Sequence, residues 1–415
     1  MSTVEEIVVN PENQWRLETP GAQGWSGSAW PGNEKKYFIV STDSHLGPPP
    51  TLFRDRIEDK YKSRLPRLEV NKENGRRTLH LEGRRPMPLI EDKVTGEDLV
   101  RMKSGSAGST LLLGGGPTVG ERVRDQNADG IDAEIIFPNG PGLLMWGTHD
   151  PLFAQAQCRI WNDWAWEACA EHRDRCFPVA ALATGDIEGS VAEVQRAAKM
   201  GFKVLALPCK PIWGPGDASH LNYNLKDFDP LWAAIQDTDL AITFHVSTGT
   251  DPRAARGDGG AIINYVVHAL APTIEPVVNL CTSGALERFP GLRFATIEAN
   301  AGWLAWLLEA MDEGYRKHHM WVSPKLKQLP GELYRQHGFA SVCEDQAAYD
   351  LCEKHRLTDN LMFANDYPHH EGSWPHSAQT IERRMGALQE TTRRKILGLN
   401  AARFLKIDIP KTYQR

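Results

Sequence analysis

The feature that most constrains the fold is a regular alternation of short apolar segments with segments of helical periodicity. The alternation of strands and helices favours parallel strand pairing with right-handed crossovers. Eight such units predict closure into an α/β barrel rather than an open sheet. The strand-like segments lie near residues 37–43, 131–137, 177–183, 202–207, 240–245, 292–298, 339–342 and 361–366.

The expected fold is therefore a (β/α)8 TIM barrel with an insertion after strand one and an N-terminal arm. The barrel is predicted over residues 37–406, with the insertion at 46–128 placed where it can cover an active site. Residues 1–36 are polar, broken by Gly and Pro, and carry three tryptophans, so we expect an arm that lies against this chain or a neighbouring subunit. Residues 407–415 are predicted to form a C-terminal tail.

Composition excludes several classes of protein. The chain has 415 residues, 41% hydrophobic and 24% charged, which is enough for a sizeable core. Its net charge of -6 provides no basic field for nucleic acid or anionic lipid. No stretch approaches the roughly 20 apolar residues of a membrane span, and the acidic start lacks the apolar core of a signal peptide. A cytoplasmic location is the resulting expectation.

Cysteine spacing and glycine motifs exclude further kinds of site. The seven cysteines are scattered and include no C-x-x-C pair, which argues against a disulfide framework and a thiolate zinc site. No G-x-G-x-x-G follows the first strand, so a dinucleotide-binding fold is unsupported. The glycine run Gly114–Gly116 has no G-K-[ST] after it, so it is not a P-loop.

Acids and histidines stand where several predicted strands end. Asp43 and His45 lie two residues apart, a spacing that puts both side chains on one face of a strand. His245 and Asp366 end two other strands. In a barrel such ends face a common cavity. Carboxylates and imidazoles gathered there are costly to bury unless a divalent cation neutralises them, so the four residues predict a metal site.

Further candidates follow from the same argument. Glu298 ends the sixth strand and is predicted to be a metal ligand, because it would otherwise carry an unpaired charge into the cavity. His369 follows Asp366 by three residues and is the better candidate than its neighbour His370 for a ligand or proton carrier. Arg253 and Arg256 are candidates to bind a substrate carboxylate, with a solvated loop as the alternative.

Seven motifs resemble the amidohydrolase superfamily, in the amidohydrolase-related branch that includes aminocarboxymuconate-semialdehyde decarboxylase. The resemblance runs from about residue 37 to residue 406. The motifs are STDSH at 41–45, DGIDAEIIFPN at 129–139, DPLWAAI at 229–235, ITFHVSTG at 242–249, SGALERFPGLRF at 283–294, MFANDYPHHEGSWP at 362–375 and ILGLNAARFL at 396–405.

The resemblance implies a distorted barrel whose metal ligands come from strands one, five and eight. By position these are Asp43 and His45, His245, and Asp366. The family's usual pair on strand one is H-x-H or E-x-H, and its decarboxylases have a histidine where this chain has Glu298. These two departures add carboxylates, which favours iron or manganese as well as zinc, with one or two ions bound.

Three functional interpretations follow. The first is metal-assisted hydrolysis or non-oxidative decarboxylation of a small organic substrate that is expected to bear a carboxylate, with Asp366 and His369 as catalytic residues. The second is a dinuclear non-haem iron or manganese oxygenase, similar to 2-aminoisobutyric acid hydroxylase, in which Glu298 binds a second metal. The third is the partner subunit of a hetero-oligomer with a related chain, the alternative to a homo-oligomer. Nucleic acid and membranes are not expected as partners.

Overall fold

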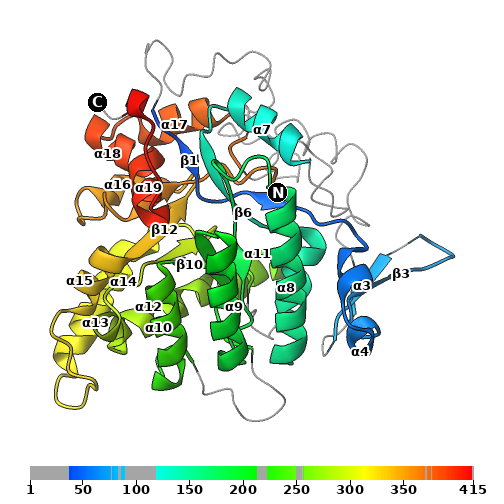
Figure 1. Ribbon diagram of the computed structural model, residues 1–415. Coiled ribbons are helices and arrows are strands. Elements are labelled where there is room, and N and C mark those ends of the chain that lie inside the picture. Colours follow the sequence, from blue (N-terminus) through cyan, green and yellow to red (C-terminus); the bar gives the residue numbers. More distant parts are fainter. Residues whose placement is uncertain are drawn as a thin grey trace.

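A computed structural model of the chain describes most of the predicted barrel (Figure 1). The predicted arm at 1–36 lies outside the described residues, as does the part of the insertion from 89 to 117. The described residues are 37–75, 77–82, 86–88, 118–212, 222–248, 255, 257–369, 372–374 and 376–413.

The strands form a ring of parallel neighbours. One sheet has the order β13-β12-β11-β10-β9-β8, and in the other β6 pairs with β1, β2 and β7. All of these pairings are parallel, as alternating strands and helices predict. The strands are β1 (Val40–Ser41), β2 (His45–Leu46), β6 (Ala133–Pro138), β7 (Cys176–Pro178), β8 (Ala180–Ala181), β9 (Val204–Leu207), β10 (Ala241–His245), β11 (Phe294–Ile297), β12 (Gly338–Val342) and β13 (Leu361–Phe363).

Two junctions join these sheets into a barrel. The first and last strands meet where the Thr42 amide donates to the Phe363 carbonyl at 2.9 Å, and where Ser44 forms a parallel bridge with Tyr367. The second junction is the third predicted strand, which is split: β7 pairs with β6, and β8, two residues later, pairs with β9. The predicted distorted (β/α)8 barrel is thereby confirmed.

Helices cover the outside of the barrel, and Figure 1 shows α8, α9 and α10 standing side by side in front of the strands. The helices are α3 (Leu52–Arg56), α4 (Asp59–Lys62), α7 (Val119–Ala128), α8 (Pro151–Ala168), α9 (Ile187–Met200), α10 (Asp229–Thr238), α11 (Gly260–Ile263), α12 (Ile274–Thr282), α13 (Ala285–Arg288), α14 (Trp303–Lys317), α15 (Pro330–His337), α16 (Gln346–Cys352), α17 (Ser377–Met385), α18 (Glu390–Arg394) and α19 (Asn400–Leu405). Asn264–Leu270 and Lys395–Leu399 form π-helices.

The alternation of side chains along the strands decides which residues face the cavity. On β10, Ile242 and Phe244 belong to the hydrophobic cluster that contains Leu231 and Trp232 of α10, so they point outward to the helices. Successive side chains of a strand point to opposite faces. His245 therefore points into the barrel, although the whole strand is buried.

The helical periodicity of the sequence covers residues 276–289, but the structure divides this segment. The structure has α12 and α13 instead of one helix, because Gly284 adopts a left-handed conformation with φ of 78° and interrupts the hydrogen-bond pattern.

The described part of the insertion contains a small antiparallel sheet of β3 (Arg67–Val70), β4 (Arg77–His80) and β5 (Met87–Pro88). It projects from the barrel beside α3 and α4 (Figure 1). At the other end of the chain, Ile407, Ile409 and Tyr413 pack against the core. Within the described ranges, no helix is both long enough and apolar enough to cross a bilayer.

Two glycines provide a matched test of the packing. A Cβ at Gly185 would lie 1.5 Å from the Ile212 carbonyl oxygen, whereas a Cβ at Gly314 in α14 would meet no atom within 4 Å. We expect Gly185→Ala to lower the free energy of unfolding by at least the 1–3 kcal/mol that is roughly typical of overpacking. Gly314→Ala should raise it by about 0.5–1 kcal/mol, because alanine favours the helix. Urea unfolding of both variants measures the difference, and equal effects would contradict the described packing.

Candidate metal centre

Five of the predicted site residues lie at the carboxyl ends of barrel strands. Asp43 lies between β1 and β2, and His45 begins β2. His245 is the last residue of β10. Glu298 directly follows β11, and Asp366 lies three residues after β13. Barrel closure brings these positions, up to 323 residues apart in the sequence, to one rim.

The side chains converge within a few ångströms of one another. His45 Nε2 lies 3.4 Å from Asp43 Oδ1 and 3.3 Å from Asp366 Oδ1. His245 Nε2 lies 3.4 Å from Asp43 Oδ1 and 3.3 Å from Glu298 Oε2. The His369 ring is perpendicular to the His45 ring, with centroids 4.2 Å apart.

Backbone carbonyls fix how the two central histidines present their nitrogens. His45 Nδ1 lies 3.1 Å from the Pro138 carbonyl oxygen, and His245 Nδ1 lies 2.8 Å from the Val246 carbonyl oxygen. Because a carbonyl only accepts, each Nδ1 carries the proton and donates it. In a neutral ring Nε2 then has a lone pair directed at the cluster, which is the arrangement that metal-binding histidines use.

Two of the carboxylate residues have a left-handed backbone conformation, which residues other than glycine rarely adopt. Glu298 has φ of 54° and Asp366 has φ of 52°. The left-handed region costs about 1–2 kcal/mol for a residue other than glycine. Such residues persist where the surrounding structure holds them in place, and they gather at functional sites.

The charges of the cluster are unbalanced in the described structure. Asp43, His45 and His245 are at most 3% exposed. Burial, together with the neighbouring His369 and His245 rings, holds the pKa of His45 well below its ordinary value. Burial also acts to lower the pKa of His245, but the Asp43 and Glu298 carboxylates outweigh it and raise that pKa to about 9. The carboxylates thus draw a positive charge into the cluster.

A divalent cation fits this cluster. Asp43 Oδ1, His45 Nε2 and His245 Nε2 are buried and have no hydrogen-bond partner, which is costly for polar atoms unless a cation lies between them. The side chains form two groups that share His45, and within each group the potential ligand atoms all lie within 4.8 Å of one another. The first group is Asp43, His45, His245 and Glu298, and the second is His45, Asp366 and His369.

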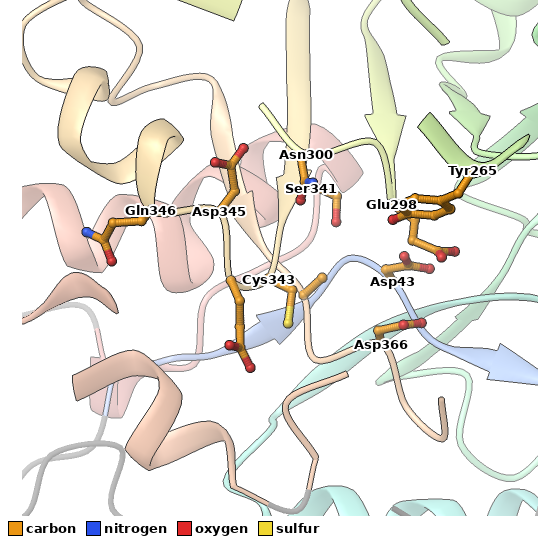
Figure 2. Close-up of a pocket in the computed structure, with 11 residues that line it drawn as sticks. Asp43, Tyr265, Glu298, Asn300, Ser341, Cys343, Asp345, Gln346 and Asp366 are labelled. Carbon is orange, nitrogen blue, oxygen red and sulfur yellow. The ribbon is translucent and has the colours of Figure 1, made fainter. Parts of the chain in front are cut away.

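A cavity of about 390 Å³ opens onto one side of the cluster. Figure 2 shows Asp43, Glu298 and Asp366 together on one side of this cavity, with Cys343 and Asp345 on the other. Of the described residues that line it, five are carboxylic acids and none is basic. The lining residues are Asp43, Tyr265, Glu298, Asn300, Ser341, Cys343, Glu344, Asp345, Gln346, Ala364 and Asp366.

The structure therefore brings together all six residues that the sequence singled out as ligands or proton carriers: Asp43, His45, His245, Glu298, Asp366 and His369. Their roles as ligands remain a prediction. Arg253, Arg256 and His370 lie outside the described residues.

Sequence reasoning missed the opposite wall of the cavity. Ser341, Cys343 and Glu344 lie at the end of β12 or just after it, and Asn300 lies three residues after β11. The signal was available, because these residues occupy the same position relative to their strands as His245 and Asp366. The segment 339–342 is only four residues long, and Cys343 rather than an acid or a histidine follows it directly. Its end was therefore not identified as part of the site.

The chain is similar to several decarboxylases in sequence. Gamma-resorcylate decarboxylase of Rhizobium radiobacter is 24% identical over 304 residues, which are 69% of this chain and 86% of the relative. The enzyme of the same name from Rhodococcus jostii (strain RHA1) is 25% identical over 303 residues, 69% of this chain and 87% of the relative.

Solved structures share the fold. 5-Carboxyvanillate decarboxylase from Sphingomonas paucimobilis has a TM-score of 0.62 and 20% identity, covering 90% of this chain and 100% of that one. A dihydroxybenzoic acid decarboxylase from Polaromonas sp. JS666, solved with bound manganese and the inhibitor 2-nitroresorcinol, has a TM-score of 0.62 and 18% identity, covering 91% and 100%. The family model described as Amidohydrolase matches residues 120–407. As that match spans more than half of the chain, the protein belongs to the amidohydrolase family, as its motifs predicted.

Proposed function

We propose that this protein is a metal-dependent decarboxylase that removes CO2 from a small aromatic carboxylate without an oxidant. The similar enzymes named above are decarboxylases, and three of the similar structures hold manganese. The described cluster offers three carboxylates and three imidazoles, a mixed oxygen and nitrogen set that suits Mn²⁺. One Mn²⁺ per chain is the corresponding proposal for the cofactor.

One observation carries this proposal: the cavity opens directly onto the carboxylates of the cluster. Asp43, Glu298 and Asp366 line it, and none of its described lining residues is basic. A substrate carboxylate would be repelled by these acids in the metal-free protein. With a cation bound between them, the same surface would instead attract an anion.

Four of the residues would only hold the cation, whereas Asp366 and His369 would contact it and also handle the proton. Asp43, His45, His245 and Glu298 would hold it from one side, with Asp366 and His369 completing the set. The bound cation supplies positive charge that binds and polarises the substrate carboxylate. The cavity volume of about 390 Å³ is at the lower end of the usual range for ligand pockets and suits a single-ring acid.

Asp366 is placed to handle the proton. When the bond between the ring carbon and the carboxylate breaks, CO2 leaves and the electron pair stays on the ring carbon. A proton must reach that carbon, and a protonated Asp366 carboxyl, which lines the cavity, can donate it. His369 belongs to the same group of side chains and can hold a proton near Asp366 between turnovers.

The other predicted reactions have less support. Hydrolysis by a metal-activated water uses the same residues, but the similar enzymes are named as decarboxylases. The comparisons lend no support to the dinuclear oxygenase. Decarboxylation is therefore the function that the site supports best.

The metal ligands can be tested with Mn²⁺ alone. Mutating a residue that only supports a metal ligand typically weakens metal binding by roughly 10- to 100-fold. We expect His245→Ala, which removes a ligand itself, to weaken Mn²⁺ binding by more than that. His268→Ala is the matched control, because His268 is half-buried, belongs to neither candidate ligand group, and is hydrogen-bonded to Asn264 within the same π-helix. Titration followed by electron paramagnetic resonance measures both affinities. Wild-type affinity in His245→Ala would contradict the assignment.

Removal of the metal should affect stability as well as activity. A ligand at about 100 times its Kd stabilises the folded state by about 2.7 kcal/mol. We therefore expect exhaustive chelation to abolish turnover and lower the Tm, and Mn²⁺ to restore both. Full turnover in a preparation that contains no metal would refute the proposed cofactor.

The role of Asp366 predicts a separation of binding from turnover. Asp366→Asn should reduce kcat by about 10²- to 10⁴-fold, because the amide cannot donate a proton to carbon, while much of the Mn²⁺ affinity remains. Asp132→Asn is a control, since Asp132 accepts a hydrogen bond from the Ile39 amide before β1. Unchanged kcat in Asp366→Asn would exclude the proposed proton transfer.

The reaction class can be measured with the acids whose names the similar enzymes carry. We expect CO2 release from gamma-resorcylate or 5-carboxyvanillate under nitrogen, with deuterium from D2O appearing at the ring carbon that lost CO2. Oxygen consumption coupled to turnover, or turnover without CO2 release, would instead indicate one of the other two reactions.

A further inference from the structure

One face of helix α7 is polar and buried. Arg122, Gln126 and Asp129, which follow a spacing of four and then three residues, are at most 1% exposed. Residues at that spacing share one side of a helix, here extended by the residue that caps its end. A polar side chain out of water is costly unless it forms hydrogen bonds, so the partners of this face are informative.

The partners of Arg122 belong to the elements that carry the candidate metal ligands. Arg122 Nη2 donates to the backbone carbonyl of His45. Its Nη1 donates to Glu134 Oε2 on β6 at 2.7 Å, and its guanidinium carbon lies 4.9 Å from the centroid of the Tyr367 ring. Arg122 thus contacts the backbone of the candidate ligand His45 and the ring of Tyr367, which directly follows the candidate ligand Asp366.

Gln126 and Asp129 both bind Asn365, the residue immediately before Asp366. Asn365 Nδ2 donates to Gln126 Oε1 at 2.8 Å and to Asp129 Oδ2 at 3.1 Å. Gln126 is fixed in turn, because its Nε2 donates to Glu134 Oε2 at 2.6 Å. Asn365 is fully buried, so these bonds are shielded from water.

The other atoms of Asn365 reach the first strand. Asn365 Oδ1 accepts from Ser41 Oγ at 2.8 Å, and the Asn365 amide donates to the same hydroxyl oxygen at 3.0 Å. The Ser41 hydroxyl also lies 2.8 Å from the Asp43 carbonyl. One carboxamide therefore connects α7, the strand that leads to Asp43, and the segment that carries Asp366.

The backbone beside Asn365 needs such support. Asp366 has φ of 52°, and its amide donates to the Asp43 carbonyl at 3.0 Å. The returning chain packs against this turn so closely that a Cβ at Gly372 would lie 2.3 Å from the Asn365 carbonyl oxygen. A left-handed aspartate persists only where its surroundings hold it.

We infer that Asn365, anchored by Gln126 and Asp129 of the α7 segment, is a positioning residue that holds the Asp366 carboxylate in the geometry the metal centre requires. The Asn365 side chain is engaged by Gln126, Asp129 and Ser41, so it acts through Asp366 and, by way of Ser41, through Asp43. This inference rests on the metal centre of the proposed function.

A matched pair of asparagines tests the inference. Asn360 and Asn365 flank the two ends of β13, both are at most 1% exposed, and each side chain donates two hydrogen bonds. Asn360 donates to the Arg335 and Gly338 carbonyls, and neither of these residues is bonded to Asn365 or belongs to the candidate metal centre. Asn365→Ala and Asn360→Ala should therefore lower the Tm alike. Asn365→Ala alone should weaken Mn²⁺ binding, by about 10- to 100-fold, and by more than Asp366→Asn does, because its loss also releases the Asp43 segment through Ser41.

A pair of aspartates provides a second test with a milder change. It can be used even if Asn365→Ala does not fold. Asp129→Asn leaves only one acceptor oxygen where the carboxylate has two, and Asp129 Oδ2 accepts from both Asn365 Nδ2 and the Ser377 hydroxyl while Oδ1 accepts from the Ser377 amide. Asp132→Asn, three residues away, changes the bond to the Ile39 amide and leaves Asn365 untouched. We expect weaker Mn²⁺ binding and a changed electron paramagnetic resonance spectrum of the bound Mn²⁺ in Asp129→Asn only.

The outcomes separate this inference from the proposal beneath it. Wild-type protein that does not bind Mn²⁺ would overturn the metal centre and the inference together. Wild-type protein that binds Mn²⁺, with unchanged affinity and spectrum in Asp129→Asn and in any folded Asn365→Ala, would overturn the positioning role and leave the metal centre standing. A lower Tm in these variants with no change at the metal would mean that the bonds serve stability alone.

Discussion

The functional site depends on the closure between the first and last strands of the barrel. The Thr42 amide bonds to the Phe363 carbonyl, and the His45 amide bonds to the Tyr367 carbonyl at 2.6 Å. These bonds join segments more than 300 residues apart in the sequence. Without them Asp366 would not lie beside His45, and the candidate ligands would form two separate half-sites. The same bonds that complete the barrel therefore assemble the cluster.

Closure also creates the electrostatic problem that a cation resolves. Burying carboxylates beside each other is unfavourable, and one imidazole can offset only part of the charge by taking up a proton. The raised pKa of His245, despite its burial, reflects how strongly Asp43 and Glu298 draw positive charge inward. A divalent ion supplies more charge than one proton and also satisfies the buried atoms that have no hydrogen-bond partner.

Much of the fold and the centre of the site could be predicted from sequence because both depend on local patterns. Strand-like segments ending in Asp, His or Glu identified the rim, and barrel geometry required those ends to meet. The split between β7 and β8 follows Pro178, which cannot donate a ladder hydrogen bond, so the apolar run 177–183 carries a sign of an interruption but not of the pairing on either side. Register, and thus which neighbour each half joins, depends on long-range pairing that single segments do not encode.

The supporting residues were harder to predict for the same reason. Arg122 and Gln126 resemble the polar residues of an ordinary surface helix, and only tertiary packing shows that they are buried. Glu134 was the available signal, because a charged residue within the apolar segment 131–137 needs a partner. The domain boundaries, the oligomeric state and the cytoplasmic location stay predictions.

The rim has a rigid side and an accessible side, and this asymmetry bears on how a substrate would reach the metal. The side chains of His45 and Asp43 are 1% exposed, whereas that of Glu298 is 21% exposed. The cavity also opens past Glu298, Asp43 and Asp366 rather than past the histidines. The imidazoles of His45 and His245, which are hydrogen-bonded through Nδ1 to backbone carbonyls, would thus form a fixed base for an ion. A substrate approaching along the carboxylate side would meet the ion without displacing that base, so binding need not disturb the hydrogen bonds that close the barrel.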